Sequence, residues 1–89
     1  MNCTSPKPEW LVIVNPNAGN GKGKKEWHII SSALKNRNIE FRFRFTSGKG
    51  DATSLAHDGI KDGYHKIITV GGDGTLNEVL NGVFQSGID

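Results

Sequence analysis

Residues Gly71 to Thr75, with the sequence Gly-Gly-Asp-Gly-Thr, are the part of this 89-residue chain whose residue types point most directly to chemistry. They stand between an apolar run, Lys66 to Val70, and a stretch in which apolar residues recur at helical spacing. Glycines at such a junction let backbone N–H groups approach a phosphate closely, and the following helix adds the positive end of its dipole. The segment therefore predicts a phosphate-binding turn between a strand and a helix.

The carboxylate of Asp73 is the unusual feature of this turn, because it repels phosphate directly. It becomes useful if Mg²⁺ lies between the two, or if it binds a hydroxyl or amine of a nucleotide. The alternative is that Asp73 only shapes the turn, as Asp-Gly pairs often do. Thr75 and Glu78 also have a structural explanation, since Thr-x-x-Glu predicts a capping box in which each residue satisfies a backbone N–H near the other. These residues alone leave both interpretations open.

A second glycine-rich segment, Asn17 to Lys25, lies earlier in the chain. Neither segment contains G-x-x-x-x-G-K-[ST], and neither contains G-x-G-x-x-G, because Lys24 and Asn77 stand where the third glycine is required. A P-loop NTPase and a Rossmann dinucleotide site are therefore disfavoured. Lys22, Lys24 and Lys25 form a basic cluster that can either add charge near a phosphate or remain solvated.

The segments that must position these residues alternate between strand-like and helix-like patterns. Continuous or alternating apolar residues predict strands at Trp10–Val14, Ile39–Phe45 and Lys66–Val70. Apolar residues at helical spacing predict helices over residues 24–36, from an N-cap at Asp51 to Gly63, and from Leu76 to Phe84. The order β-α-β-α-β-α implies an α/β fold with a three-layer arrangement and a parallel sheet.

Loops after parallel strands meet at one edge of the sheet, where ligands bind in folds of this class. The three loops expected there are Asn15–Gly23, Thr46–Gly50 and Gly71–Thr75.

Composition and charge give no argument for a nucleic-acid partner. A net charge of +2 does not by itself indicate a nucleic-acid-binding protein. In Ile39–Phe45 the aromatic and arginine side chains alternate, so the strand is expected to have one buried and one solvated face rather than a mixed nucleic-acid platform.

The single cysteine, Cys3, cannot form an internal disulfide, which predicts a reducing, cytoplasmic setting.

The two glycine-rich segments together carry a family resemblance. VNPNAGNGKG (Val14 to Gly23), followed later by VGGDGTLNEVLNG (Val70 to Gly82), resembles the diacylglycerol kinase catalytic-domain family, in particular bacterial diacylglycerol and sphingosine kinase-like lipid kinases. The intervening FTSGKGDATSLA is similar to the threonine loop of that family. NAD kinases and phosphofructokinases carry forms related to GGDGT, so it is the pair of motifs that supports the resemblance.

The resemblance implies that residues 1–89 are an incomplete N-terminal ATP-binding domain of the NAD kinase/diacylglycerol kinase-like type, and that the chain is a fragment. A β-rich C-terminal domain, absent here, would supply the catalytic base, further Mg²⁺ ligands and the lipid groove. The complete enzyme would be an ATP-dependent lipid kinase of phospholipid biosynthesis, transferring the γ-phosphate of ATP to a lipid hydroxyl. No catalytic residue is expected in this chain, and the 89 residues alone are expected to be inactive.

The resemblance also implies ATP and Mg²⁺ as cofactors, with an indirect, nucleotide-linked metal role for Asp73. It implies a lipid acceptor such as diacylglycerol, no nucleic acid, and a cytoplasmic protein in peripheral contact with the inner membrane face. The nucleotide-binding residues carried over from the family motifs are Asn15, Pro16, Asn17, Ala18, Gly19, Thr46, Gly71, Gly72, Asp73, Gly74, Thr75, Leu76, Asn77 and Glu78.

Two alternatives stay open at this point. An NAD kinase-like enzyme shares GGDGT, although the NPNAGNGKG loop and the NEVLNG continuation argue against it. The second alternative is of another class: a nucleotide-binding or regulatory module, or a non-catalytic nucleotide-binding fragment.

Overall fold

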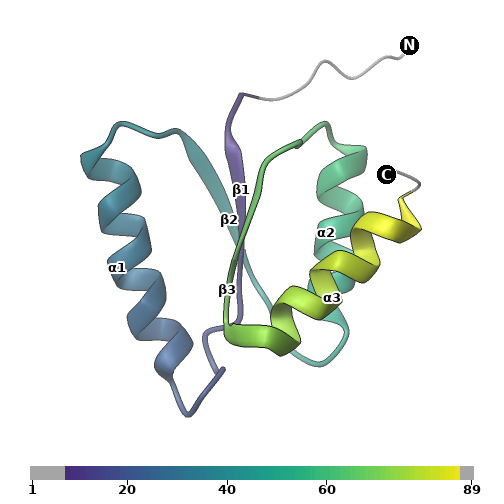
Figure 1. The fold of residues 1–89 in the computed structure, drawn as a ribbon, viewed down its shortest axis with the longest axis horizontal. Helices are drawn as coiled ribbons and strands as arrows, with labels where there is room; N and C mark the ends of the chain where they lie inside the picture. Colours follow the sequence, from purple (N-terminus) through teal and green to yellow (C-terminus); the bar gives the residue numbers. More distant parts are fainter. Residues whose placement is uncertain (1–7, 87–89) are drawn as a thin grey trace.

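The computed structural model describes residues 8–86, which form three layers, with one helix on one face of a sheet and two helices on the other (Figure 1). Cys3 lies outside the described residues. The elements, in chain order, are β1 (Trp10–Val14), α1 (Lys22–Asn36), β2 (Phe41–Phe45), α2 (Asp51–Lys61), β3 (Ile67–Val70) and α3 (Gly72–Gln85). The predicted three-layer α/β fold is confirmed. Over residues 8–86 no helix is both long and apolar enough to cross a lipid bilayer.

Strand β1 is the centre of the sheet, because its apolar residues can be buried on both faces. It pairs in parallel with β2 on one side and with β3 on the other. Leu11 and Ile13 belong to a buried cluster with residues of α2 and α3, whereas Val12 and Val14 belong to a second cluster with residues of α1. The alternation of side chains along one strand thus joins all three layers.

The boundary between α1 and β2 differs from the prediction. The strand predicted at Ile39–Phe45 begins only at Phe41, so this bound is wrong. The backbone N–H of Ile39 donates to the carbonyl of Leu34 at 3.0 Å, and Asn38 adopts a left-handed φ of 58°. These two residues therefore close the end of α1 instead of pairing in the sheet. Helix α1 itself starts two residues before its predicted bound, and β3 starts one residue after.

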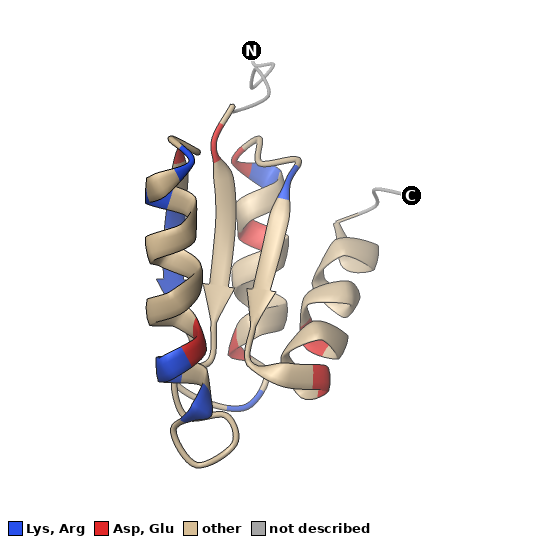
Figure 2. Ribbon diagram, turned by 60° about the vertical axis from the view of Figure 1, so that its left-hand side comes forward, with Lys and Arg blue, Asp and Glu red and all other residues tan. Residues whose placement is uncertain are grey.

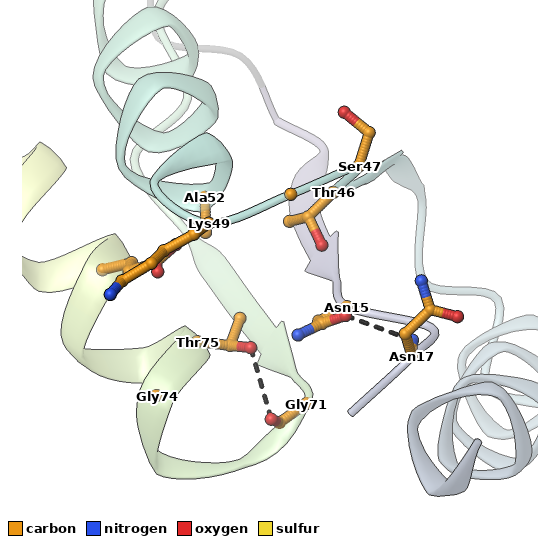
Figure 3. Close-up of a pocket in the computed structure, with 11 residues that line it drawn as sticks. Asn15, Asn17, Thr46, Ser47, Lys49, Ala52, Gly71, Gly74 and Thr75 are labelled. Atoms are coloured by element: carbon orange, nitrogen blue, oxygen red, sulfur yellow. Dashed lines mark hydrogen bonds between the residues drawn. The ribbon is translucent and has the colours of Figure 1, made fainter. Parts of the chain in front are cut away.

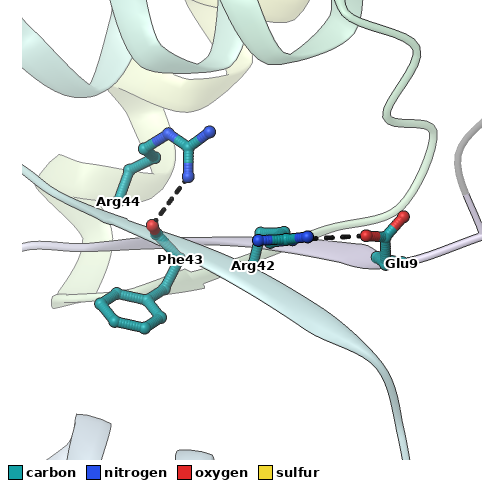
Figure 4. Close-up of polar contacts among 4 residues, drawn as sticks. All are labelled: Glu9, Arg42, Phe43 and Arg44. Atoms are coloured by element: carbon teal, nitrogen blue, oxygen red, sulfur yellow. Dashed lines mark hydrogen bonds and ion pairs between the residues drawn. The ribbon is translucent and has the colours of Figure 1, made fainter.

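The aromatic face of β2 is only half covered, because β2 is an edge strand. Phe43 and Phe45 are 46% and 50% exposed, although their ring centroids lie 5.1 and 6.2 Å from that of Trp27 on α1. Arg44 lies on the other side of the strand from Phe43 and donates to the Phe43 carbonyl at 3.0 Å (Figure 4). The predicted separation of aromatic and arginine faces is confirmed, whereas the predicted burial of the aromatic face is wrong at this end of the strand.

Helix α3 buries only part of its apolar stripe. Val79 is 3% exposed and packs in the cluster beneath α2 and α3, whereas Phe84 is 70% exposed. Leu76 and Leu80 are exposed as well, so these two residues and Phe84 form an apolar row at i, i+4 and i+8 on the outer face. The apolar residues of α3 therefore fall into a buried group and an exposed group, because α2 and the sheet contact only one side of the helix.

Alanine at position 79 and alanine at position 84 are expected to affect stability very differently. Val79→Ala removes buried methyl groups and should lower the free energy of unfolding by about 2 kcal/mol. Phe84→Ala should change it by less than about 0.5 kcal/mol. Urea unfolding of the two purified variants measures the difference, and equal losses would contradict the placement of Phe84 on the outer face.

Candidate functional site

The carboxyl ends of the three strands bring Asn15, Thr46 and Gly71 to one edge of the sheet. The register pairs the last residues of the three strands with one another. Beyond them the backbone N–H of Asn15 donates to the carbonyl of Val70, and that of Thr46 donates to the carbonyl of Val14, both at 2.8 Å. The sheet ladder therefore holds the start of each loop, and the loops meet as the strand order predicts.

A cavity of about 380 Å³ opens at this edge (Figure 3). Its volume lies within the range of small-molecule sites in proteins. The wall comes from the loops that follow the three strands, from the first turn of α2 and from the first two turns of α3. The lining residues are Asn15, Asn17, Thr46, Ser47, Gly48, Lys49, Ala52, Gly71, Gly74, Thr75 and Glu78.

Only part of the predicted nucleotide-binding set lies in the cavity wall. The predicted residues that line it are Asn15, Asn17, Thr46, Gly71, Gly74, Thr75 and Glu78. The predicted residues outside the lining are Pro16, Ala18, Gly19, Gly72, Asp73, Leu76 and Asn77. Within α3 the division follows helix geometry, because residues spaced by three or four share a face and their neighbours point elsewhere.

The Gly-Gly-Asp-Gly segment is the N-terminus of α3 rather than a separate turn before it. Gly71 is the N-cap, with φ 139° and ψ 16°, and the helix begins at Gly72. No side chain caps this end. Most helices place an oxygen of Ser, Thr, Asp or Asn against the N–H groups of the first turn. Here those groups have no side-chain acceptor, so together with the helix dipole they favour an anion.

The capping box predicted for Thr75 and Glu78 is wrong. Because Gly71 is the N-cap, the hydroxyl of Thr75 lies inside the helix and donates to the Gly71 carbonyl at 3.2 Å. The carboxylate of Glu78 instead accepts the backbone N–H of Gly50 at 3.2 Å. Glu78 therefore joins α3 to the loop between β2 and α2, and its role is tertiary.

The loop between β2 and α2 forms more of the wall than the sequence indicates. Gly50 is the N-cap of α2, so the predicted N-cap at Asp51 is wrong. The Asp51 carboxylate accepts the backbone N–H and the hydroxyl of Ser47, at 2.8 and 3.2 Å. The sequence prediction missed Ser47, Gly48, Lys49 and Ala52. Ser47, Gly48 and Lys49 could have been predicted, because they belong to a glycine-bearing loop directly after a parallel strand. Ala52 could not, because its position in the sequence shows only the apolar spacing of a helix.

Most of the charged residues that the sequence singles out lie outside the lining of this cavity. Lys22 and Lys24 lie at the start of α1 and outside the lining. Figure 2 shows basic residues gathered at this end of α1, at the edge of the sheet where the strands end. Asp73 is exposed on the first turn of α3 and is also outside the lining. The charged residues of the lining are Lys49 and Glu78. Residues 8–86 contain no group of three or more His, Cys, Asp or Glu side chains that could hold a metal ion.

The chemistry of this wall suits binding more than proton transfer. It combines amide and hydroxyl side chains, the uncapped N-terminus of α3 and one lysine, which are the groups that hold phosphates in proteins. Glu78 is the one carboxylate among the lining residues and is engaged with Gly50. The lining therefore holds no second carboxylate beside it.

Comparisons with known proteins agree with this architecture. The model of the diacylglycerol kinase catalytic domain matches residues 9–89. A diacylglycerol kinase of Staphylococcus haemolyticus is 39% identical over 74 residues, which cover 83% of this chain and 22% of the relative. Sphingoid long-chain bases kinase 1 of Arabidopsis thaliana is 40% identical over 88 residues, which cover 93% of this chain and 11% of the relative.

A solved structure, "A putative diacylglycerol kinase from Bacillus anthracis str. Sterne", superposes with a TM-score of 0.64 at 30% identity. The match covers 84% of this chain and 27% of that one. The chain thus spans about a quarter or less of the length of the curated relatives it matches. It belongs to the diacylglycerol kinase catalytic-domain family.

Proposed function

We propose that this chain is the nucleotide-binding domain of an ATP-dependent lipid kinase, and that its carboxyl-edge cavity receives the phosphates of Mg-ATP. The observation that carries the proposal is the uncapped N-terminus of α3 beside this cavity, in a chain of the diacylglycerol kinase catalytic-domain family. Gly71 to Thr75 would bind the phosphates. Asn15 and Thr46 would contact the nucleotide from the two neighbouring loops.

A β-rich second domain is proposed to bind the lipid that accepts the phosphate. The names of two relatives refer to diacylglycerol and to sphingoid long-chain bases, which share a hydroxyl on a lipid. We therefore propose a lipid hydroxyl, such as that of diacylglycerol, as the acceptor. Such a substrate would place the enzyme in peripheral contact with the cytoplasmic face of the membrane.

In the proposed transfer the acceptor oxygen bonds to the γ-phosphorus, the bond to the β–γ bridging oxygen breaks, and ADP leaves. The hydroxyl proton would pass to a base in the second domain. Positioning and electrostatic stabilisation dominate phosphoryl transfer. The contribution proposed for this chain is the first turn of α3, whose N–H groups would face the phosphate oxygens. The 89 residues alone should therefore bind nucleotide without transferring phosphate.

Titration of the chain with MgADP and MgATP, followed by its amide resonances, tests the proposed site. The largest shifts are expected at Gly71 to Thr75 and in the loop at residues 46–50. Amides near Lys61, at the opposite end of α2, should stay unchanged. A folded chain whose Gly71 to Thr75 amides do not respond to either nucleotide would contradict the proposal.

Gly74→Ala distinguishes a glycine required by a ligand from one required by the fold. An added Cβ at Gly74 meets no atom within 4 Å, and its φ is outside the left-handed region. Alanine is favoured over glycine in helices by up to about 1 kcal/mol, so the variant should be at least as stable as the parent chain. The methyl group occupies open space beside the cavity, so affinity for MgADP should fall about tenfold. Unchanged affinity in this stable variant would contradict close approach of a phosphate.

A further inference from the structure

Lys49 is the cation among the residues that line the cavity. It extends from the loop between β2 and α2 toward α3 (Figure 3). Within residues 8–86 its ammonium group has no hydrogen bond and no ion pair within 4.0 Å. Lys49 precedes the N-cap of α2, and it shares the cavity lining with Gly74 and Thr75 of the first turn of α3. An unpaired ammonium group in this cavity is free to bind an anion, and lysine binds phosphate as a point charge.

The loop that carries Lys49 is held on both sides. Toward the sheet, the backbone N–H of Thr46 donates to the carbonyl of Val14 at 2.8 Å. Toward α3, the N–H of Gly50, the residue after Lys49, donates to the Glu78 carboxylate at 3.2 Å. In the first turn of α2, the hydroxyl of Thr53 donates to the main-chain carbonyl of Glu78 at 2.7 Å. Glu78 thereby fixes the backbone beside Lys49 relative to the first turn of α3.

We propose that Lys49 binds the polyphosphate of the nucleotide, and that Glu78 is a positioning residue that holds the Lys49 loop against α3. The inference rests on the proposed function and deepens it, because it assigns the phosphate-binding cation to the second loop. The lysines of the first glycine-rich segment, Lys22 and Lys24, lie outside the cavity lining. Discrimination between nucleotides of different phosphate number would then depend on Lys49.

Binding of ADP and of adenosine to the whole chain, measured by amide shifts, tests Lys49. Lys49→Met should weaken ADP binding about tenfold and leave adenosine binding unchanged, because adenosine carries no phosphate. Lys49→Arg should retain most of the ADP affinity. Lys61→Met is the matched control, since Lys61 lies at the far end of α2, and Lys24→Met tests the competing cation.

Glu78 is tested by asking whether it acts through Lys49. Glu78→Gln keeps an oxygen that can accept the Gly50 N–H, so the tenfold effect of Lys49→Met should persist in that background. Glu78→Ala removes the acceptor, so in its background Lys49→Met should cost less than about twofold in ADP affinity. The Gly50 amide resonance should move in Glu78→Ala and stay near its original position in Glu78→Gln. Melting curves identify any variant that is not folded.

The outcomes separate the two proposals. If the parent chain is folded and binds neither ADP nor ATP, the proposed function fails and the assignment of Lys49 fails with it. If the parent binds ADP and Lys49→Met binds it equally well, only the inference about Lys49 is overturned. Loss of ADP affinity in Lys24→Met instead would place the phosphate-binding cation at the start of α1. Equal loss of ADP and adenosine binding in Glu78→Ala would reduce Glu78 to a purely structural role.

Discussion

Gly23→Ala is expected to lower the free energy of unfolding by about 3 kcal/mol, because α1 can start at Lys22 only if position 23 has no side chain. An added Cβ at Gly23 would overlap the carbonyl oxygen of Asn15 and lie 3.1 Å from its carbonyl carbon. Those are backbone atoms at the end of β1, so they cannot move without displacing the loop that begins the cavity wall. For a domain of this size the melting temperature should fall by roughly 12 to 24 °C.

Gly74→Ala is the matched control for this experiment, because both glycines lie in the first turn of a helix and only Gly23 faces a backbone atom. Helix propensity alone would make both substitutions favourable. Urea unfolding of the two variants should therefore move their midpoints in opposite directions, or leave Gly74→Ala unchanged. A Gly23→Ala chain as stable as the parent would show that α1 does not dock on Asn15 as described.

Gly71→Ala is expected to cost about 2 to 4 kcal/mol of unfolding free energy and to abolish measurable binding of MgADP. Its φ of 139° is a conformation that L side chains rarely adopt. An added Cβ would also lie 2.7 Å from the hydroxyl oxygen of Thr75 and 2.8 Å from the Cβ of Asn15. Relief of this overlap would move the first turn of α3 away from the end of β1, where the cavity lies.

Gly72→Ala separates backbone strain from overlap of the added Cβ. Gly72 has a φ of 85°, but no atom lies within 4 Å of an added Cβ. It should show the backbone strain alone, about 1 to 2 kcal/mol. Chemical denaturation compares the unfolding free energies of the two variants, and MgADP titration compares their affinities. A Gly72→Ala chain less stable than Gly71→Ala would contradict the close contact of Gly71 with Asn15.

Much of the fold follows from local patterns. The apolar run of β1 and the helical spacing in the three helical segments predict the element order, and that order predicts loops at one edge of a parallel sheet. The structure confirms this arrangement. Errors arose where a local rule competed with a tertiary contact. Thr75 and Glu78 match a capping box in sequence, but the left-handed Gly71 starts the helix earlier and leaves Glu78 to bind Gly50.

The sequence by itself determined the α/β architecture, the family and the segments that form the carboxyl edge, because these depend on periodicity and on motifs short enough to be recognised locally. Only the tertiary structure decided which side chains of those segments share a cavity. Asp73 and Lys49 illustrate the difference. The glycine-rich motif singles out Asp73, whereas Lys49 is the one of the two that lines the cavity. The physical reason is that Glu78 and Gly50 are 28 residues apart, and their contact depends on how α2 packs on α3 and on the strand register.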